Sequence, residues 1–190
     1  MDSGNLGRRS IRLRGYDYSR PGAYFVTLCT QNRECLFGNV TGGVMHLNEL
    51  GKIIQSEWFR TTEIRNEIKL DAFVVMPNHL HGVVVIGDNG TEKPKNSGPF
   101  VVGATGRSPL RNGITKPGPR SRSLGAFIAG FKSITTKRIH TIRGMEFFRV
   151  WQRNYYERIV RDDDELNRIR WYIINNPKNW FLDVNNQTEP

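Results

Sequence analysis

The chain has 190 residues and a formal net charge of +10, from 28 lysines and arginines against 18 aspartates and glutamates. A chain of this length forms one domain with a hydrophobic core, and its excess of positive charge favours nucleic acid as a partner. No apolar run approaches the roughly 20 residues of a membrane-spanning helix, and the first residues contain no signal-peptide core. Two cysteines without Cys-x-x-Cys spacing argue against disulfides and a structural zinc, so we expect a cytoplasmic protein.

Residues 1–22 are predicted to form a basic arm that leads into the domain and ends in a Pro-Gly turn signal. Arginine side chains contact phosphates and tyrosine rings stack on unpaired bases, so the arm is a candidate nucleic-acid-binding element, with a disordered tail as the alternative. Its candidate contact residues are Arg8, Arg9, Arg12, Arg14, Tyr16 and Tyr18.

The first half of the domain has the pattern of one strand, one helix and a hairpin. Residues 23–33 are rich in aromatic and β-branched residues and predict a strand. Residues 47–64 place apolar residues at helical spacing, with Asn48 as the N-cap. Residues 68–76 and 79–86 predict two strands joined by a Pro-Asn turn.

Residues 87–122 interrupt this pattern with a stretch dense in glycine, proline, serine and basic residues. Such a composition buries too little apolar surface to offset the entropy of ordering, so we predict a flexible basic insert, or a loop that orders on a bound strand.

The second half of the domain predicts a helix, a strand and a final helix. The first helix begins after Ser123 as its cap and ends at Gly144. Residues 148–160 contain the fourth strand. The last helix opens with acidic residues and must end at the Asn-Pro pair, because proline cannot continue a helix.

This order of elements predicts an α+β fold of the ferredoxin-like type, β-α-β-β-α-β with a split βαβ sheet, followed by a C-terminal helix. We assign residues 23–180 to this single domain and residues 181–190 to a C-terminal tail. A fold of this type places helices on one face of the sheet and leaves the other face available, without saying what binds there.

Two histidines interrupt the apolar third strand. Residues i and i+2 of a strand point to the same face, so the His79 and His81 side chains lie side by side. Two neutral imidazoles in this arrangement are two thirds of a metal site, and the alternative is a hydrogen-bonded structural pair.

The last helix carries two polar residues beside its apolar stripe. Tyr172 and Asn176 are neighbours at i and i+4 and flank the side that packs on the sheet. If this helix lies near the histidines, Asn176 completes a site of two histidines and one oxygen, and Tyr172 lies within reach of it. The alternatives are packing for the tyrosine and a turn role for the asparagine.

Several motifs resemble one family in their order along the chain. The segment "MPNHLHGVVV" is similar to the His-hydrophobic-His motif of the HUH nucleases. Together with "AYFVTLCTQNR", "VWQRNYYERIVR" and "YIINNP", it resembles the single-tyrosine transposase superfamily and, within it, the REP-associated tyrosine transposases. The resemblance covers residues 8–180, and the long basic insert departs from shorter members.

The resemblance implies a role for each matched residue. His79 and His81 correspond to the metal-binding histidines, Asn176 to the third ligand and Tyr172 to the catalytic tyrosine. Tyr155 and Tyr156 match an aromatic pair of structural or DNA-stacking function, "YY" in "WQRNYYER". The implied reaction is cleavage and strand transfer of single-stranded DNA through a 5′-phosphotyrosine, with Mg²⁺ or Mn²⁺ as the cofactor.

The implied partners are single-stranded DNA hairpins of the bacterial nucleoid rather than a membrane, and monomer and homodimer both remain open. The second helix offers further candidate phosphate contacts, with a solvated helix face as the alternative: Lys132, Lys137, Arg138 and Arg143. Two other functions remain open. One is a non-catalytic ferredoxin-like module that binds single-stranded nucleic acid, and the other is a two-histidine hydrolase that uses water.

Overall fold

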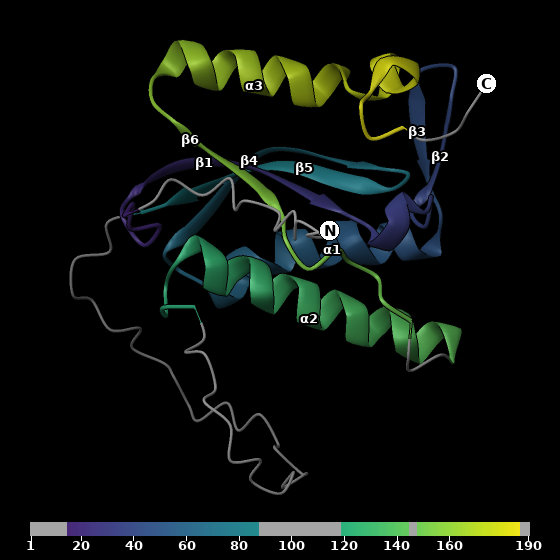
Figure 1. Ribbon diagram of the computed structural model, residues 1–190, viewed down its shortest axis with the longest axis horizontal. Helices are drawn as coiled ribbons and strands as arrows, with labels where there is room; N and C mark the ends of the chain where they lie inside the picture. Colours follow the sequence, from purple (N-terminus) through teal and green to yellow (C-terminus); the bar gives the residue numbers. More distant parts are fainter. Residues whose placement is uncertain (1–14, 88–118, 145–147, 187–190) are drawn as a thin grey trace, which may run out of the picture.

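The computed structural model describes residues 15–87, 119–144 and 148–186, and its centre is a four-stranded antiparallel sheet. The strand order is β4 (Ile68–Met76), β5 (His79–Ile86), β1 (Gly22–Cys29) and β6 (Tyr156–Val160), as Figure 1 shows. In the β-α-β-β-α-β order, β1 is the first strand, β4 the second and β5 the third. Because β5 lies between β1 and β4, the sheet is a split βαβ sheet. The predicted α+β, ferredoxin-like fold is therefore confirmed.

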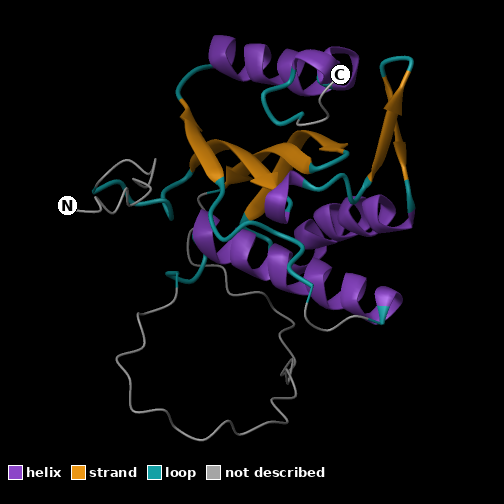
Figure 2. Cartoon of the chain, turned by 45° about the vertical axis from the view of Figure 1, so that its right-hand side comes forward, coloured by secondary structure: helices purple, strands orange, loops and turns teal. Residues whose placement is uncertain are grey.

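Helices cover both faces of this sheet. The helices α1 (Glu49–Ile64) and α2 (Leu124–Arg143) lie on one face, and α3 (Asp163–Asn175) lies on the other (Figures 1 and 2). The predicted caps are present, because Asn48 accepts from the N–H of Gly51 and Ser123 from that of Ala126. The face that a ferredoxin-like sheet leaves available is thus partly covered by the C-terminal helix.

One hairpin of the structure was not predicted from the sequence. The strands β2 (Gly38–Thr41) and β3 (Val44–Leu47) form a separate two-stranded sheet between β1 and α1. Its turn residues Gly42 and Gly43 have φ angles of 58° and 74°, which glycine adopts without strain. A Gly-Gly pair between two β-prone runs is a hairpin signal, and it was available in the sequence.

Other differences concern the ends of elements. The strand predicted over residues 23–33 ends at Cys29, and a short 3-10 helix, η1 (Gln31–Arg33), follows it. The helix α3 ends before Pro177, as predicted, and a second 3-10 helix, η2 (Pro177–Leu182), continues the chain. Most of the predicted insert, residues 88–118, lies outside the described residues, as do Arg8, Arg9, Arg12 and Arg14.

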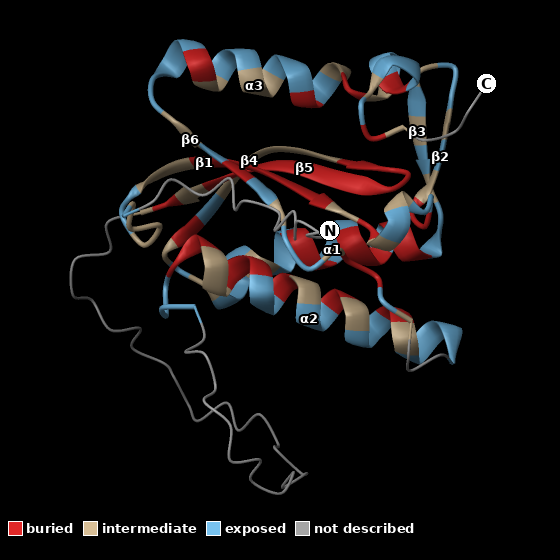
Figure 3. Cartoon of the chain, in the orientation of Figure 1, coloured by how far each residue is buried: buried red, intermediate tan, exposed pale blue. Residues whose placement is uncertain are grey.

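The main hydrophobic core lies between the sheet and the α1–α2 layer, where buried residues concentrate (Figure 3). Trp58 of α1 is completely buried there and packs directly on Gly82 of β5. A Cβ atom at Gly82 would lie 2.4 Å from Cζ2 of Trp58, so only glycine permits this contact.

Strand β5 contributes side chains to both faces of the sheet. Leu80 and Val84 belong to the main core, whereas Val83 joins Phe25 and Ile173 in a smaller cluster under α3. By the same alternation, His79 and His81 point toward α3. No helix in the described part of the chain is both long and apolar enough to cross a membrane.

Candidate active site

The two histidines of β5 form the centre of the site. Their side chains are buried, and the Nε2 atoms of His79 and His81 lie 3.0 Å apart. Strand pairing fixes them from both sides, because β5 hydrogen-bonds to β1 and to β4. The sequence prediction that the pair shares one face of the strand is confirmed.

Hydrogen bonds to the other ring nitrogens orient both imidazoles. Nδ1 of His79 lies 2.8 Å from Oδ1 of Asn78, whose amide nitrogen donates to the carbonyls of Arg33 and Asn185. Because the Asn78 oxygen can only accept, His79 carries its proton on Nδ1 and a lone pair on Nε2. Nδ1 of His81 lies 2.8 Å from the hydroxyl of Thr27, which leaves its Nε2 facing the same point.

Burial keeps both imidazoles neutral. Desolvation lowers the pKa of His79 to about 4, against an opposing effect of the nearby Asp183 carboxylate. It also lowers the pKa of His81 well below the usual value, and the neighbouring His79 adds to this effect. Neutral imidazoles with convergent lone pairs are the form that binds a metal ion.

Helix α3 brings a phenol to the histidines. The hydroxyl of Tyr172 lies 3.1 Å from Nε2 of His81, and its ring makes an edge contact with Phe25. Burial, followed by the charge of Asp183, raises the pKa of Tyr172 to about 12. The phenol is therefore protonated at neutral pH, and a phenol becomes a nucleophile only when its proton is removed.

Two oxygen-bearing side chains complete the group. The amide nitrogen of Asn176 donates to Oδ2 of Asp183 at 2.9 Å, and that Oδ2 lies 3.8 Å from Nε2 of His79. The amide oxygen of Asn176 is buried and accepts no hydrogen bond from the described residues.

The donor set fits a metal ion. Ligand atoms of His79, His81 and Asp183 all lie within 4.8 Å of one another. An unsatisfied buried oxygen costs roughly 1–3 kcal/mol, and a cation beside Asn176 would offset that cost. Two imidazoles and a carboxylate also match the ligand preferences of divalent ions.

Asp183 was not among the predicted ligands, because it lies in residues 181–190, which were predicted to form a C-terminal tail. The structure fixes its segment beside the site: Arg33 donates to the carbonyl of Val184 and to Oδ1 of Asn185. The backbone N–H of Asn185 in turn donates to Oδ1 of Asp183 at 2.7 Å. No motif in the sequence marks this aspartate; only the return of the chain after η2 brings it to the histidines.

A pocket of about 870 Å³ opens next to the Tyr172 hydroxyl. Its walls include the aromatic rings of Phe25, Tyr156 and Tyr172 and the basic side chains of Lys132 and Arg153. Aromatic rings beside positive charges suit the bases and phosphates of an unpaired strand.

The structure gives most of the other predicted DNA-binding residues intramolecular partners. The Lys132 ammonium donates to the carbonyls of Gln152 and Asn154, and Arg138 pairs with Glu57 of α1. The guanidinium of Arg143 lies over the phenyl ring of Phe148. Lys137 is exposed on α2.

The two tyrosines of the N-terminal arm pack inward. The rings of Tyr16 and Tyr18 are 4.9 Å apart, and both contact the buried ring of Tyr24. These contacts extend the main core, so the described part of the arm is anchored to the domain.

Comparison with solved structures defines the class of the fold. The chain is similar to a REP-associated tyrosine transposase whose structure was solved bound to a REP hairpin, with a TM-score of 0.54 and 16% sequence identity over 89% of this chain and 73% of that chain. The resemblance to this family is thereby confirmed for the fold: the protein has the HUH single-tyrosine transposase fold.

Comparison of sequences gives the family. No family model matches the chain. An uncharacterized protein of Haemophilus influenzae is 39% identical over 176 residues, which cover 93% of this chain and 91% of that protein. The chain belongs to the same family as this Haemophilus influenzae protein.

Proposed function

We propose that the protein cleaves and rejoins single-stranded DNA at hairpin-containing sequences through a covalent bond between Tyr172 and DNA. The observation that supports this function is the 3.1 Å contact between the Tyr172 hydroxyl and the buried histidine pair, at the edge of an open pocket. A two-histidine hydrolase that uses water has no need for a phenol in this position.

The reaction is a transesterification. The Tyr172 oxygen loses its proton and attacks the phosphorus of a phosphodiester, and the bond between phosphorus and the 3′-oxygen breaks. The 3′-oxygen takes up a proton and leaves as a 3′-hydroxyl, while the 5′-phosphate remains bound to Tyr172. Another 3′-hydroxyl then attacks the phosphotyrosine, joins the strands and restores the phenol without a nucleotide cofactor.

The chain's own residues prepare this step. Nε2 of His79 and of His81, with an oxygen of Asp183 or Asn176, would hold a divalent ion, for which we propose Mg²⁺ or Mn²⁺. Such an ion supplies charge stabilisation at the phosphate when bound. Asn78 and Thr27 hold the imidazoles in place, and Phe25 limits the position of the Tyr172 ring.

The choice of DNA as the partner has two supports. The net charge of +10 favours a polyanion, and the similar transposase was solved bound to a REP hairpin. We extend this substrate class, single-stranded DNA hairpins, to the present protein.

A denaturing gel tests the proposal. Purified protein is mixed with labelled hairpins drawn from the DNA beside its own gene, with Mn²⁺ or with EDTA. We expect a Mn²⁺-dependent band at the combined mass of protein and DNA, which protease treatment reduces to DNA with a short peptide. Tight binding without any such band across the pool would favour a non-catalytic binding module.

A further inference from the structure

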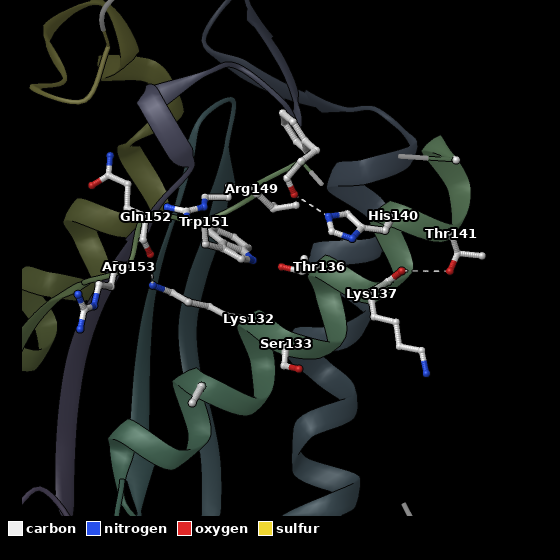
Figure 4. Close-up of a pocket in the computed structure, with 14 residues that line it drawn as sticks. Lys132, Ser133, Thr136, Lys137, His140, Thr141, Arg149, Trp151, Gln152 and Arg153 are labelled. Carbon is white, nitrogen blue, oxygen red and sulfur yellow. Dashed lines mark hydrogen bonds between the residues drawn. The ribbon is translucent and has the colours of Figure 1, made fainter. Parts of the chain in front are cut away.

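A second hollow lies between α2 and the segment before β6 (Figure 4), and it shares lining residues with the site pocket. One wall is formed by residues 129–144 of α2 and its end, and the other by residues 148–153, which precede β6. Its volume is about 1180 Å³. We call this hollow the α2 groove.

The α2 groove is strongly basic. Lys137 comes from the helix wall, and Arg149 and Arg153 come from the opposite wall. All three side chains are exposed, and within the described residues none of them forms an ion pair and no acidic residue lines the groove. Three positive charges around one hollow, without an ion-pair partner in the described part of the chain, create a site for an anion.

The groove and the site pocket are joined. Lys132, Gln152 and Arg153 line both of them. The Lys132 ammonium lies at the junction and donates to the carbonyls of Gln152 at 2.8 Å and Asn154 at 3.0 Å, so it fixes the segment that separates the two hollows. A chain molecule that leaves the Tyr172 pocket past Arg153 therefore enters the α2 groove.

The shape of the groove selects the kind of anion. Its volume far exceeds that of one phosphate, and its charges are distributed over two walls rather than gathered around a point (Figure 4). The hydroxyls of Ser133, Thr136 and Thr141 add uncharged groups that bond phosphate oxygens well. Regularly spaced phosphates match this arrangement better than a single small anion.

We infer that the α2 groove binds the phosphodiester backbone of the DNA that continues from the cleavage pocket, with Lys137, Arg149 and Arg153 as its phosphate contacts. Lys132 is a positioning residue, since its two carbonyl contacts hold residues 152–154 between the hollows. The inference rests on the proposed function. It adds a second DNA contact region, outside the pocket where cleavage would take place.

Matched charge removal tests the groove. The groove variant combines Lys137→Gln with Arg149→Gln. Its control combines Lys52→Gln with Lys69→Gln, which removes the same charge from exposed positions on α1 and β4 that line neither hollow. Fluorescence anisotropy then measures the affinity for a DNA hairpin with single-stranded arms, and for the same hairpin without arms, over a range of potassium chloride concentrations.

We expect the groove variant to bind the armed hairpin about tenfold more weakly than wild type, with a salt slope smaller by roughly one for each lost phosphate contact. The control variant should change the salt slope of the affinity less than the groove variant does. Equal losses in both variants, or none in either, would overturn the inference.

A parallel adduct assay at saturating DNA separates this inference from the proposed function. Adducts in both variants, combined with equal affinities, would reject the groove alone. A selective loss of affinity in the groove variant, without adducts in any protein, would reject the cleavage chemistry and keep the groove as a DNA-binding surface.

Discussion

The Tyr172 hydroxyl lies 3.1 Å from Nε2 of His81, although the two residues are 91 positions apart in the chain. Strand β5 provides the histidine and α3 provides the tyrosine, so the contact depends on how α3 docks on the sheet. A bidentate ion pair between Arg170 of α3 and Asp71 of β4 helps to fix that docking. The geometry of the candidate site and the docking of α3 are therefore linked in this protein.

Tyr172→Phe removes the attacking oxygen and leaves the ring contact with Phe25 intact. We expect covalent adducts to disappear while hairpin affinity stays at the wild-type level, as measured by denaturing gel and by anisotropy. Tyr156→Phe changes another tyrosine that lines the same pocket, so it is the matched control and should keep its adducts. Adducts that persist in Tyr172→Phe and vanish in Tyr156→Phe would assign the nucleophile to Tyr156.

The double variant His79→Ala and His81→Ala removes both nitrogen ligands. We expect no Mn²⁺-dependent cleavage and no measurable heat of Mn²⁺ binding by calorimetry, because the remaining oxygens alone hold a divalent ion weakly. The variant should still unfold cooperatively in urea, since β5 keeps both neighbouring strands. Cleavage that still responds to Mn²⁺ would refute the metal assignment.

Asp183→Asn and Asn176→Ala decide which oxygen binds the ion. Asp183→Asn preserves shape and removes a charge beside His79, so we expect Mn²⁺ affinity to fall by roughly tenfold or more. Asn176→Ala should have the smaller effect, because it removes a neutral amide that donates to Asp183. The reverse order in calorimetry would make Asn176 the ligand and Asp183 the residue that orients it.

The pair of Asp71 and Arg170 predicts a pH-dependent contribution to stability. The hydrogen bonds from Arg170 lower the pKa of Asp71 below its usual value near 3.8. Because the folded state holds the charged form, the contribution is present above about pH 4 and is lost as the pH falls through the lowered pKa. Asp71→Asn should therefore lower the urea midpoint at neutral pH, and its difference from wild type should shrink in acid.

An exposed acidic residue on α1 provides the control for this experiment. Glu63→Gln removes a carboxylate from a position outside the docking of α3 and should leave the urea midpoint nearly unchanged at every pH. If the difference in urea midpoint between Asp71→Asn and wild type stays constant as the pH falls, the ion pair is not the source of that difference.

The close contact between Gly82 and Trp58 predicts a stability effect on the other face of the sheet. Gly82→Ala places a methyl group against the buried indole, so we expect a loss of about 1–3 kcal/mol in the free energy of unfolding in urea. Gly130→Ala on α2 is the matched control: its methyl would meet only Arg65, at 3.6 Å, and should stabilise the helix by about 0.4–1 kcal/mol. An unchanged free energy of unfolding in Gly82→Ala would mean that the Trp58 side chain moves aside at no cost.

The fold was predictable from the sequence because its elements carry strong local signals. The strands at 68–76 and 79–86 and the helix between Ser123 and Gly144 have the predicted ends, since caps, glycine and the Pro-Asn turn mark them. The β2–β3 hairpin was missed although its Gly-Gly turn was visible. Its strands have four residues each and are too short for a clear alternation.

The candidate site was predictable only where a motif marks its residues. Regular geometry places His79 beside His81 and Tyr172 beside Asn176, so spacing alone predicts each pair. Asp183 follows a 3-10 helix with no periodic pattern, and tertiary contacts of Arg33 and Asn78 fix its segment. Long-range contacts of this kind leave no signal in local sequence.

The alternation of side chains along β5 determines what an insertion or deletion in this strand would do. His79 and His81 face the site, while Leu80 and Gly82 face the core and Trp58. A deletion or insertion of one residue in β5 would exchange the two sets, so that imidazoles would enter the apolar core and the metal ligands would be lost together. Under the proposed function, Mn²⁺ binding therefore reports the register of β5, and a mutant that binds Mn²⁺ as wild type does has a correctly paired sheet.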